Sequence, residues 1–265
     1  MRKYFISLML FLLCLEKAFS LSISPQDASK IGERIWKNEC AGTIEGLTNW
    51  KKGENFASLG IGHFIWYPAG KKEHFEETFP ALLQFFLKED VTLPNWLKAD
   101  AGCPWNSRNS FYEDIHSSKM ESLRQFLLDT RSLQAIFIAN RLEAALPQIL
   151  ESCSQVEKAK ISNLFHRLAK DADGLYALID YLNFKGTGTS PKESYKGQGW
   201  GLLQVLQHIP SSSKQPLVDF VETAKAILKQ RVQNSPPDRH EEQWLKGWFN
   251  RLDTYVSPPK TEIKN

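Results

Sequence analysis

The chain has 265 residues, of which 42% are hydrophobic and 24% are charged. These proportions are those of an ordinary globular protein and exclude a disordered chain. The formal net charge is only +3, so the composition provides no broad basic field that would attract nucleic acid.

The first 20 residues have the pattern of a signal peptide. Arg2 and Lys3 precede an apolar run from Tyr4 to Leu15, which is too short to span a bilayer, and small residues around Ala18 to Ser20 suit cleavage after Ser20. Removal of this segment takes away three basic residues and one acidic residue and lowers the net charge to +1. We therefore expect an exported protein, periplasmic or secreted, with no membrane segment in the mature form and no nucleic-acid partner.

Three cysteines remain after the signal peptide, at positions 40, 103 and 153. In an oxidising compartment an odd number allows at most one disulfide within the chain, and the spacing does not choose among the three pairs. No Cys or His residues have the spacing of metal ligands, so we expect neither a metal nor a cofactor.

The mature chain begins with a helix signal. Ser24 is a good N-cap, and Pro25 suits the first helical position. Ala28, Ile31 and Ile35 then follow at helical spacing. Glu39 comes four residues after Ile35, so it continues the apolar stripe at the end of this helix. A carboxylate in that position is either paired or desolvated.

The remaining chain predicts an α+β fold that is mostly α-helical. Phe56 to Tyr67 reads as extended and predicts a small β-hairpin after the first helix. Apolar spacing predicts a long helical region over 120–138, with Pro147 interrupting the next stretch. Further helices are expected over 175–182 and 217–228, and after Pro236-Pro237. We expect a signal peptide at 1–20, one domain over 21–256 and a flexible tail over 257–265.

Ser58-Leu59-Gly60-Ile61-Gly62-His63 follows two candidate acids, Glu39 and Glu45. The segment resembles the lysozyme-like superfamily of phage-type and goose-type lysozymes, lytic transglycosylases and chitosanases. In phage-type members, a catalytic Glu ends a helix and the next hairpin carries Thr-x-Gly-x-Gly-His. Glu45-Gly46-Leu47 is similar to the Glu-Gly-Leu at the phage-type acid, whereas Glu39-Cys40-Ala41-Gly42 is similar to the Glu-Ser end of the goose-type helix.

The resemblance implies an enzyme that cleaves a β-1,4-linked amino-sugar polymer, with peptidoglycan as the expected polysaccharide partner. Glu39 is preferred as the acid because its helical phase points inward, and Glu45 is its competitor. Lys52 stands where phage-type members carry Asp, and Glu54 is the nearest acid. Glu54 or Glu45 could therefore assist in hydrolysis, whereas a lytic transglycosylase could use one Glu.

Six residues are candidate substrate contacts. Ser58 and His63 belong to the hairpin motif, while Trp66 and Tyr67 could stack on sugar faces; either aromatic could instead be core. Asn183 and Lys185 precede the Gly186-Thr187-Gly188-Thr189 loop, which could line a saccharide cleft or simply connect two helices.

Three other interpretations compete with catalysis by Glu39. Glu39 could be paired with Arg34 or Lys37 and serve only the fold. The chain could be a glycan-binding or cell-envelope protein that keeps the scaffold without the reaction, as the missing Asp would allow. Finally, Cys40 and His63 could form a thiol hydrolase, although no cysteine-protease signature surrounds Cys40.

Overall fold

The structure is a computed structural model that describes residues 21, 23–71 and 75–256; the expected signal peptide and C-terminal tail lie outside these residues. The described part is mostly helical with a small antiparallel sheet, as the sequence predicts. None of its helices is long and apolar enough to cross a membrane. The helices are α1 (Pro25–Glu39), α2 (Phe79–Lys88), α3 (Arg108–Glu113), α4 (Ser118–Asp129), α5 (Arg131–Ile149), α6 (Gln155–Leu168), α7 (Ala172–Lys185), α8 (Leu202–His208), α9 (Pro216–Asn234) and α10 (Leu245–Asp253).

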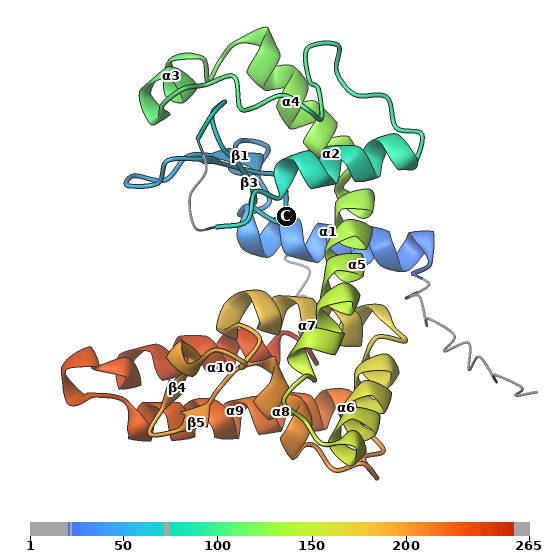
Figure 1. Cartoon of the computed structure of the whole chain (residues 1–265), viewed down its shortest axis with the longest axis vertical. Helices are drawn as coiled ribbons and strands as arrows, with labels where there is room; N and C mark the ends of the chain where they lie inside the picture. The colour runs from blue at the N-terminus through green and yellow to red at the C-terminus, as the bar shows by residue number, and fades with distance from the viewer. Residues whose placement is uncertain (1–20, 22, 72–74, 257–265) are drawn as a thin grey trace, which may run out of the picture.

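The elements gather into two halves joined by α5 (Figure 1). The upper half of the view holds the sheet with α2, α3 and α4, and the lower half holds α6 to α10. α1 lies across the middle and packs on both α5 and α7. The end of α1 therefore lies where the two halves meet.

α1 begins as the sequence predicts. The Ser24 hydroxyl accepts a hydrogen bond from the backbone N–H of Asp27, and Pro25 opens the helix. Ala28, Ile31 and Ile35 are buried on one face. The predicted buried stripe is confirmed. Glu39 follows Ile35 by four residues and therefore lies on the same side of the helix.

The sheet after α1 has three strands, β1 (Thr48–Asn49), β2 (Ala57–Leu59) and β3 (Phe64–Trp66), in the order β1-β2-β3. Leu59 faces Phe64 across the β2–β3 hairpin, which is the hairpin that the sequence predicts. The additional strand β1 pairs antiparallel with β2 through Thr48 and Leu59. A second small pair, β4 (Ser194–Tyr195) and β5 (Gln198–Gly199), belongs to the lower half.

Two helix boundaries differ from the prediction. The helical region over 120–138 divides at Thr130, which leaves α-helical geometry with a φ of −95° and a ψ of 12°; its hydroxyl donates to the carbonyl of Phe126. Pro147 does not interrupt a helix but lies inside the last turn of α5. A proline so near the end removes only one helical hydrogen bond, and burial of Leu146 and Ile149 on either side offsets that loss.

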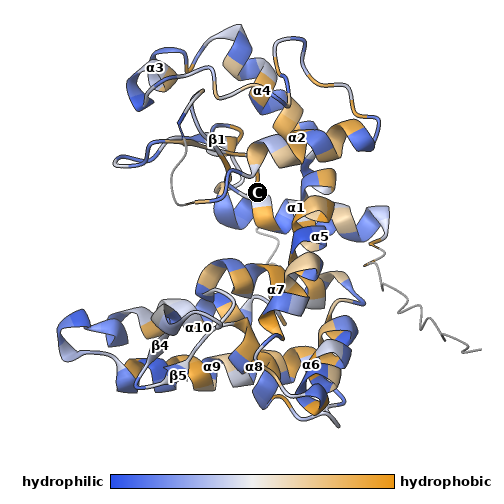
Figure 2. Ribbon diagram, in the orientation of Figure 1, coloured by the Kyte–Doolittle hydropathy of each residue, from blue (hydrophilic) through white to orange (hydrophobic). Residues whose placement is uncertain are grey.

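The buried apolar side chains of the described residues form one cluster that runs through both halves. Figure 2 shows apolar and polar residues alternating around the helices, as expected for amphipathic elements around a shared core. Cys40, Cys103 and Cys153 are all buried and unpaired.

Candidate active site

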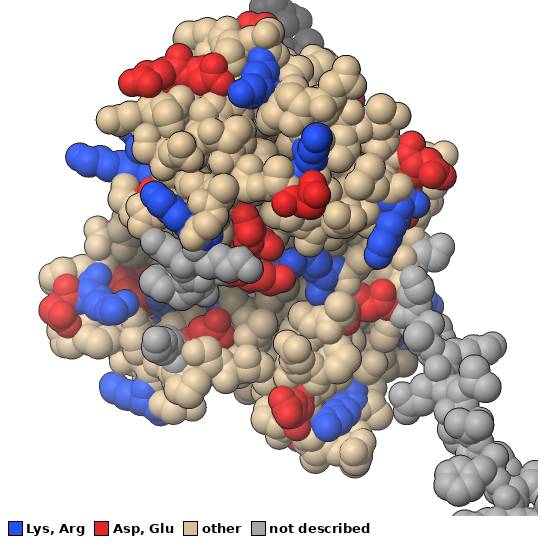
Figure 3. All heavy atoms as spheres, turned by 45° about the horizontal axis from the view of Figure 1, so that its top comes forward, with Lys and Arg blue, Asp and Glu red and all other residues tan. Residues whose placement is uncertain are grey.

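Glu39 is the last residue of α1 and lies at the junction of the two halves. The helix ends because the next residues leave helical geometry: Cys40 is the C-cap, and Ala41 and Gly42 have positive φ angles of 54° and 63°. The Glu39 side chain is 27% exposed, so it is neither sealed in the core nor open on the surface. A space-filling view shows a recess between the halves with acidic and basic side chains on its walls (Figure 3).

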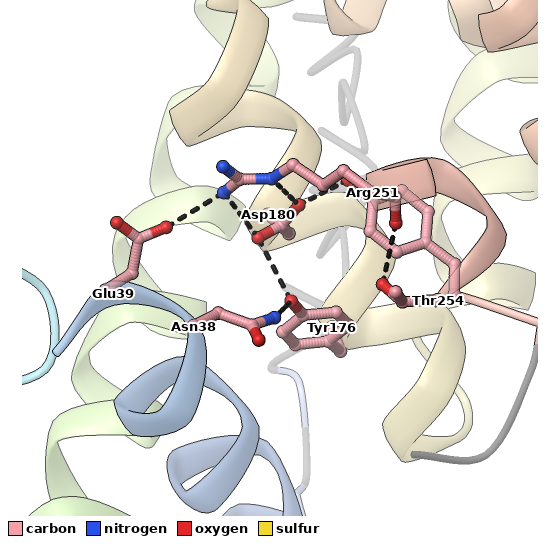
Figure 4. Close-up of polar contacts among 7 residues, drawn as sticks. Asn38, Glu39, Tyr176, Asp180, Arg251 and Thr254 are labelled. Carbon is pink, nitrogen blue, oxygen red and sulfur yellow. Dashed lines mark hydrogen bonds and ion pairs between the residues drawn. The ribbon is translucent and has the colours of Figure 1, made fainter. Parts of the chain in front are cut away.

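The partner of Glu39 is Arg251 of α10, which donates from Nη2 to Oε1 of Glu39 at 2.8 Å (Figure 4). Arg251 also donates to both oxygens of Asp180, each at 2.8 Å. Asp180 belongs to α7, is 4% exposed, and accepts further hydrogen bonds from the hydroxyls of Tyr176 and Tyr255. Burial by itself would lower the pKa of Arg251, but the hydrogen bonds and charge of Asp180, with Glu39, raise it overall.

This arrangement gives the two carboxylates different environments. Asp180 is buried and takes both of its Arg251 contacts in a chelate, so it balances the guanidinium charge. Glu39 receives a single hydrogen bond, and among the described residues its second oxygen, Oε2, has no hydrogen-bond partner. Figure 4 shows that oxygen turned away from Arg251. Oε2 is therefore the carboxylate oxygen that remains available to a ligand.

Glu39 is thus paired, but not with the residues that the fold-only interpretation proposed. Arg34 forms an ion pair with Asp173, and Lys37 forms one with Glu33. An ion pair with Arg251, more than 200 residues later in the chain, joins the first helix to the last.

The hairpin glycines have a steric role. Gly60 has a φ of +69°, and a Cβ there would lie 2.4 Å from Oε1 of Gln134. That same oxygen accepts a hydrogen bond from the backbone N–H of Ile61. A Cβ on Gly62 would lie 2.6 Å from the Phe64 ring. Both positions need glycine because the turn packs tightly against α5 and against its own strand.

His63 comes directly after these glycines, with a φ of +47°, and is half-buried. Burial lowers its pKa; the charge of Glu39 opposes this shift, Lys51 adds to it, and Glu54 opposes it. The two carboxylates are therefore close enough to act electrostatically on the same imidazole. Charges from the end of α1 and from the loop before β2 thus both act on the first residue after the hairpin glycines.

The two assisting acids have different surroundings. Glu54 is partly buried, and its Oε2 is enclosed without a hydrogen-bond partner among the described residues. Glu45 is exposed in the short 3-10 helix Glu45–Leu47 and is not among the charged groups that act on His63. The geometry therefore favours Glu39 over Glu45 as the acid and Glu54 as the second carboxylate.

The predicted contacts of Trp66 and Tyr67 with sugar are wrong in this structure, because both rings are 1% exposed. Trp66 packs against the rings of Phe79 and Trp105, and Tyr67 packs against Phe56. Other side chains cover both faces of the sheet at the end of β3. Although Trp66 and Tyr67 point to opposite faces, neither ring is therefore exposed.

Ser58 is also buried, at 5% exposure, in the middle strand of the sheet. Its backbone pairs with Asn49 on one side and with Ile65 on the other. Direct contact of this hydroxyl with a ligand is therefore excluded in this conformation, and the expectation is corrected. Of the hairpin candidates, His63 alone retains an accessible side chain.

The second predicted region lies at the end of α7. Asn183 is exposed, whereas Lys185 is 8% exposed. Gly186 ends the helix with a φ of +82°, and its carbonyl accepts from the N–H of Leu202. A Cβ on Gly201 would lie 2.1 Å from the backbone nitrogen of Gly188. The glycines here allow two backbone segments to touch, and Lys185 just before them lies over the Trp248 ring of α10.

Arg251 and Asp180 are site residues that sequence reasoning missed. Asp180 carried a usable signal: it lies among Leu175, Leu178 and Ile179 on a helix that is otherwise apolar, where a carboxylate needs a partner. Arg251 had no such signal, because a basic residue near a helix end is ordinary.

The thiol-hydrolase interpretation is excluded by the surroundings of Cys40. The thiol is 3% exposed, and Sγ donates to the carbonyl of Gly60 at 3.7 Å. Burial, with the nearby charge of Glu39, raises its pKa to about 12. A nucleophilic thiol needs a lowered pKa and an open approach, and Cys40 has neither.

Among the residues described, no group of three or more His, Cys, Asp or Glu side chains is placed to hold a metal ion. Comparison of the chain with protein-family models, with curated proteins and with solved structures found no match.

Proposed function

We propose that the chain is an exported enzyme that cleaves a β-1,4-linked amino-sugar polymer, with peptidoglycan as its substrate and Glu39 as its proton donor. The observation that carries the proposal is the Glu39 carboxylate at a helix end, held on one side by Arg251 and unpartnered at Oε2 among the described residues, with Glu54 as a second carboxylate whose charge acts on the same His63. This is the combination of a positioned acid and a second carboxylate that glycosidic cleavage requires.

In this proposal protonated Glu39 gives its proton from Oε2 to the glycosidic oxygen as the C–O bond breaks. Arg251 positions Glu39 and stabilises the carboxylate that the transfer leaves behind, because one N–H of Arg251 already contacts Oε1. Glu54 stabilises positive charge on the sugar or orients the attacking water. In a lytic transglycosylase the attacking group is a hydroxyl of the substrate itself.

A second candidate function is favoured by the same ion pair. An ion pair between two helices supports the fold whether or not its carboxylate ever transfers a proton. A protein that retained Glu39 only to join α1 to α10 would bind glycan without cleaving it. The non-catalytic glycan-binding or cell-envelope alternative therefore remains to be separated by experiment.

The test is release of soluble fragments from purified cell walls by the wild type and by Glu39→Gln. General-acid catalysis is worth roughly 10²–10⁴-fold, so we expect Glu39→Gln to lose at least a hundredfold in rate. Glu45→Gln is the matched control, because Glu45 is exposed and should retain full activity. The masses of the fragments distinguish hydrolysis, which adds water, from the transglycosylase route, which does not.

Equal activity of Glu39→Gln and the wild type would remove Glu39 from the mechanism. Wall binding by both proteins, with no fragment released by either, would establish the non-catalytic alternative instead.

A further inference from the structure

Lys185 is a buried cation without an anionic partner. It is the last residue of α7, is 8% exposed, and forms no hydrogen bond or ion pair with any described residue. Its Nζ lies 3.4 Å from the centre of the Trp248 ring and 3.9 Å from that of Phe184. Nζ is not among the fully enclosed unpartnered atoms, so it still reaches solvent. The amine therefore lies over two aromatic rings, with little of the side chain exposed to solvent.

The charged groups that face Lys185 come from α9, the 3-10 helix Glu241–Trp244 and α10. Arg231 of α9 forms a chelate with Glu241, with contacts of 2.7 and 2.8 Å, and Arg251 of α10 is balanced by Asp180. Each guanidinium thus has its own carboxylate, and Lys185 has none. Burial and then Arg231 lower the pKa of Lys185 to about 7, Glu241 opposes this, and Arg251 lowers it further. A bound anion would compensate this charge.

Lys185 is also next to the candidate active site. The Arg251 guanidinium carbon lies 4.7 Å from the centre of the same Phe184 ring that Lys185 contacts. Arg251 in turn contacts Glu39. Lys185 and Arg251 therefore lie against the same aromatic ring. A sugar or its substituent is long enough to extend from one of them to the other.

The Trp248 ring that Lys185 lies over also belongs to a surface pocket. Trp248 lines an open pocket of about 360 Å³ together with Arg231, Arg239, Glu241 and Trp244. Trp244 and Arg239 are largely exposed there. Basic side chains and aromatic rings thus alternate from Glu39 to this pocket, in the order Arg251, Phe184, Lys185 and Trp248. Such an arrangement suits a polysaccharide that carries both sugar rings and negative charge.

We propose that Lys185 binds a carboxylate carried by the glycan, so that the substrate is an anionic amino-sugar polymer rather than a neutral or cationic one. This inference rests on the proposed function and adds to it the residue that recognises the negative charge of peptidoglycan. The carboxylate could belong to a lactyl ether on the sugar or to a peptide attached to it. The two sources present the same group to the amine, and the probes below separate them.

The experiment measures dissociation constants by calorimetry in a Glu39→Gln background, where the probes are not cleaved. The probes are peptide-free glycan fragments with free lactyl carboxylates, muropeptides whose lactyl groups are amidated and whose peptides carry the carboxylates, and neutral chito-oligosaccharides of equal length. Lys185→Met keeps the length and packing of the side chain and removes its charge. Lys229→Met is the control, because Lys229 also lies over a ring, that of Phe249, but is exposed on α9.

We expect Lys185→Met to weaken binding of at least one anionic probe by roughly tenfold to a hundredfold, as loss of a charge-assisted contact does, and to leave neutral binding unchanged. The probe that is affected identifies the source of the carboxylate. Lys229→Met should leave the dissociation constants of all three probes unchanged. Binding of the anionic probe should also weaken between pH 6 and pH 8.5 as Lys185 loses its proton, and this pH dependence should disappear in Lys185→Met.

Equal losses for neutral and anionic probes, or no loss for either, would overturn the inference while leaving the proposed function intact. If the protein with Lys185 present binds none of the three glycans, both the proposed function and this inference fail.

Discussion

Lys185 places an uncompensated charge inside the folded protein, with an amine that is usually protonated in water. Its position between Trp248 and Phe184 offsets part of the desolvation through the ring faces, but no carboxylate is bonded to it among the described residues. An unpaired buried charge lowers the free energy of unfolding unless a bound anion balances it. Residues of this kind are typical of binding sites, where function is kept at a cost in stability.

The stability of Lys185→Met should therefore differ from wild type in a pH-dependent way. The lysine binds its proton with a pKa of about 7 in the folded state and of 10.5 in the unfolded state. Between these values the unfolded state binds more protons, so the free energy of unfolding of the wild type rises with pH. Lys185→Met should be the more stable protein at pH 6, and its advantage should shrink by about 4 kcal/mol by pH 10, because each pH unit above the folded-state pKa contributes about 1.4 kcal/mol.

Urea unfolding at pH 6, 8 and 10 measures this difference. Lys229→Met should keep the pH profile of the wild type, since that lysine is exposed. Parallel profiles for wild type and Lys185→Met would show that the buried amine keeps its ordinary proton affinity.

At the scale of elements, the crossing of α1 and α5 positions Glu39. Gly32 lies at this crossing, and a Cβ there would be 2.8 Å from the backbone oxygen of Arg131 and 3.0 Å from its carbonyl carbon. Backbone atoms cannot move aside as a flexible side chain can. The close approach of the two helices therefore depends on glycine inside α1, where helix propensity alone would favour alanine.

Gly32→Ala should destabilise the protein in spite of that propensity. Alanine gains up to about 1 kcal/mol in a helix, but overpacking at a rigid contact costs typically about 1–3 kcal/mol. We expect a net loss of about 1–2 kcal/mol. Gly247→Ala in α10 is the matched control, because nothing lies within 4 Å of its added Cβ, and it should stabilise by about 0.5–1 kcal/mol.

Chemical denaturation of the two variants measures both effects, and opposite signs are expected. Stabilisation of similar size by both substitutions would mean that α1 and α5 can separate at the crossing without penalty.

At the scale of the whole molecule, Asp180 joins elements from both ends of the described chain. Through Arg251 and Tyr255 it binds the C-terminal segment to α7, and through Arg251 it connects with Glu39 at the end of α1. Asp180 is almost fully buried, so these contacts act in a low dielectric and are hard to replace with water.

Asp180→Asn should destabilise the protein by about 3 kcal/mol, because it leaves Arg251 partly buried without its charge partner and points an amide donor at other donors. Wall-cleaving activity should fall as well, since Arg251 would no longer be fixed beside Glu39. The control is Glu76→Gln, which breaks the exposed ion pair with Arg141, and exposed pairs contribute about 0–1 kcal/mol. Equal, small effects of the two substitutions on urea unfolding would contradict the assigned role of Asp180.

Features that depend on residues adjacent in the chain could be predicted from the sequence. The start of α1 depends on Ser24, Pro25 and Asp27, which are adjacent in the chain, and it was predicted correctly. The β2–β3 hairpin depends on glycines within the turn. Helix boundaries were predicted less well, because α4 ends at Thr130 without a glycine or proline to mark the break, while Pro147 is tolerated near the end of α5.

The sequence by itself determined the helical character of the chain, the inward phase of Glu39 and the hairpin beside it, because neighbouring residues decide those features. Only the tertiary structure decided the partners of Glu39 and the burial of Trp66 and Tyr67. A guanidinium 212 residues away reaches Glu39, and layers from distant segments cover both sides of the aromatic strand. Such contacts depend on how whole helices and strands pack against one another. The spacing of residues along the sequence does not predict which distant segments will meet.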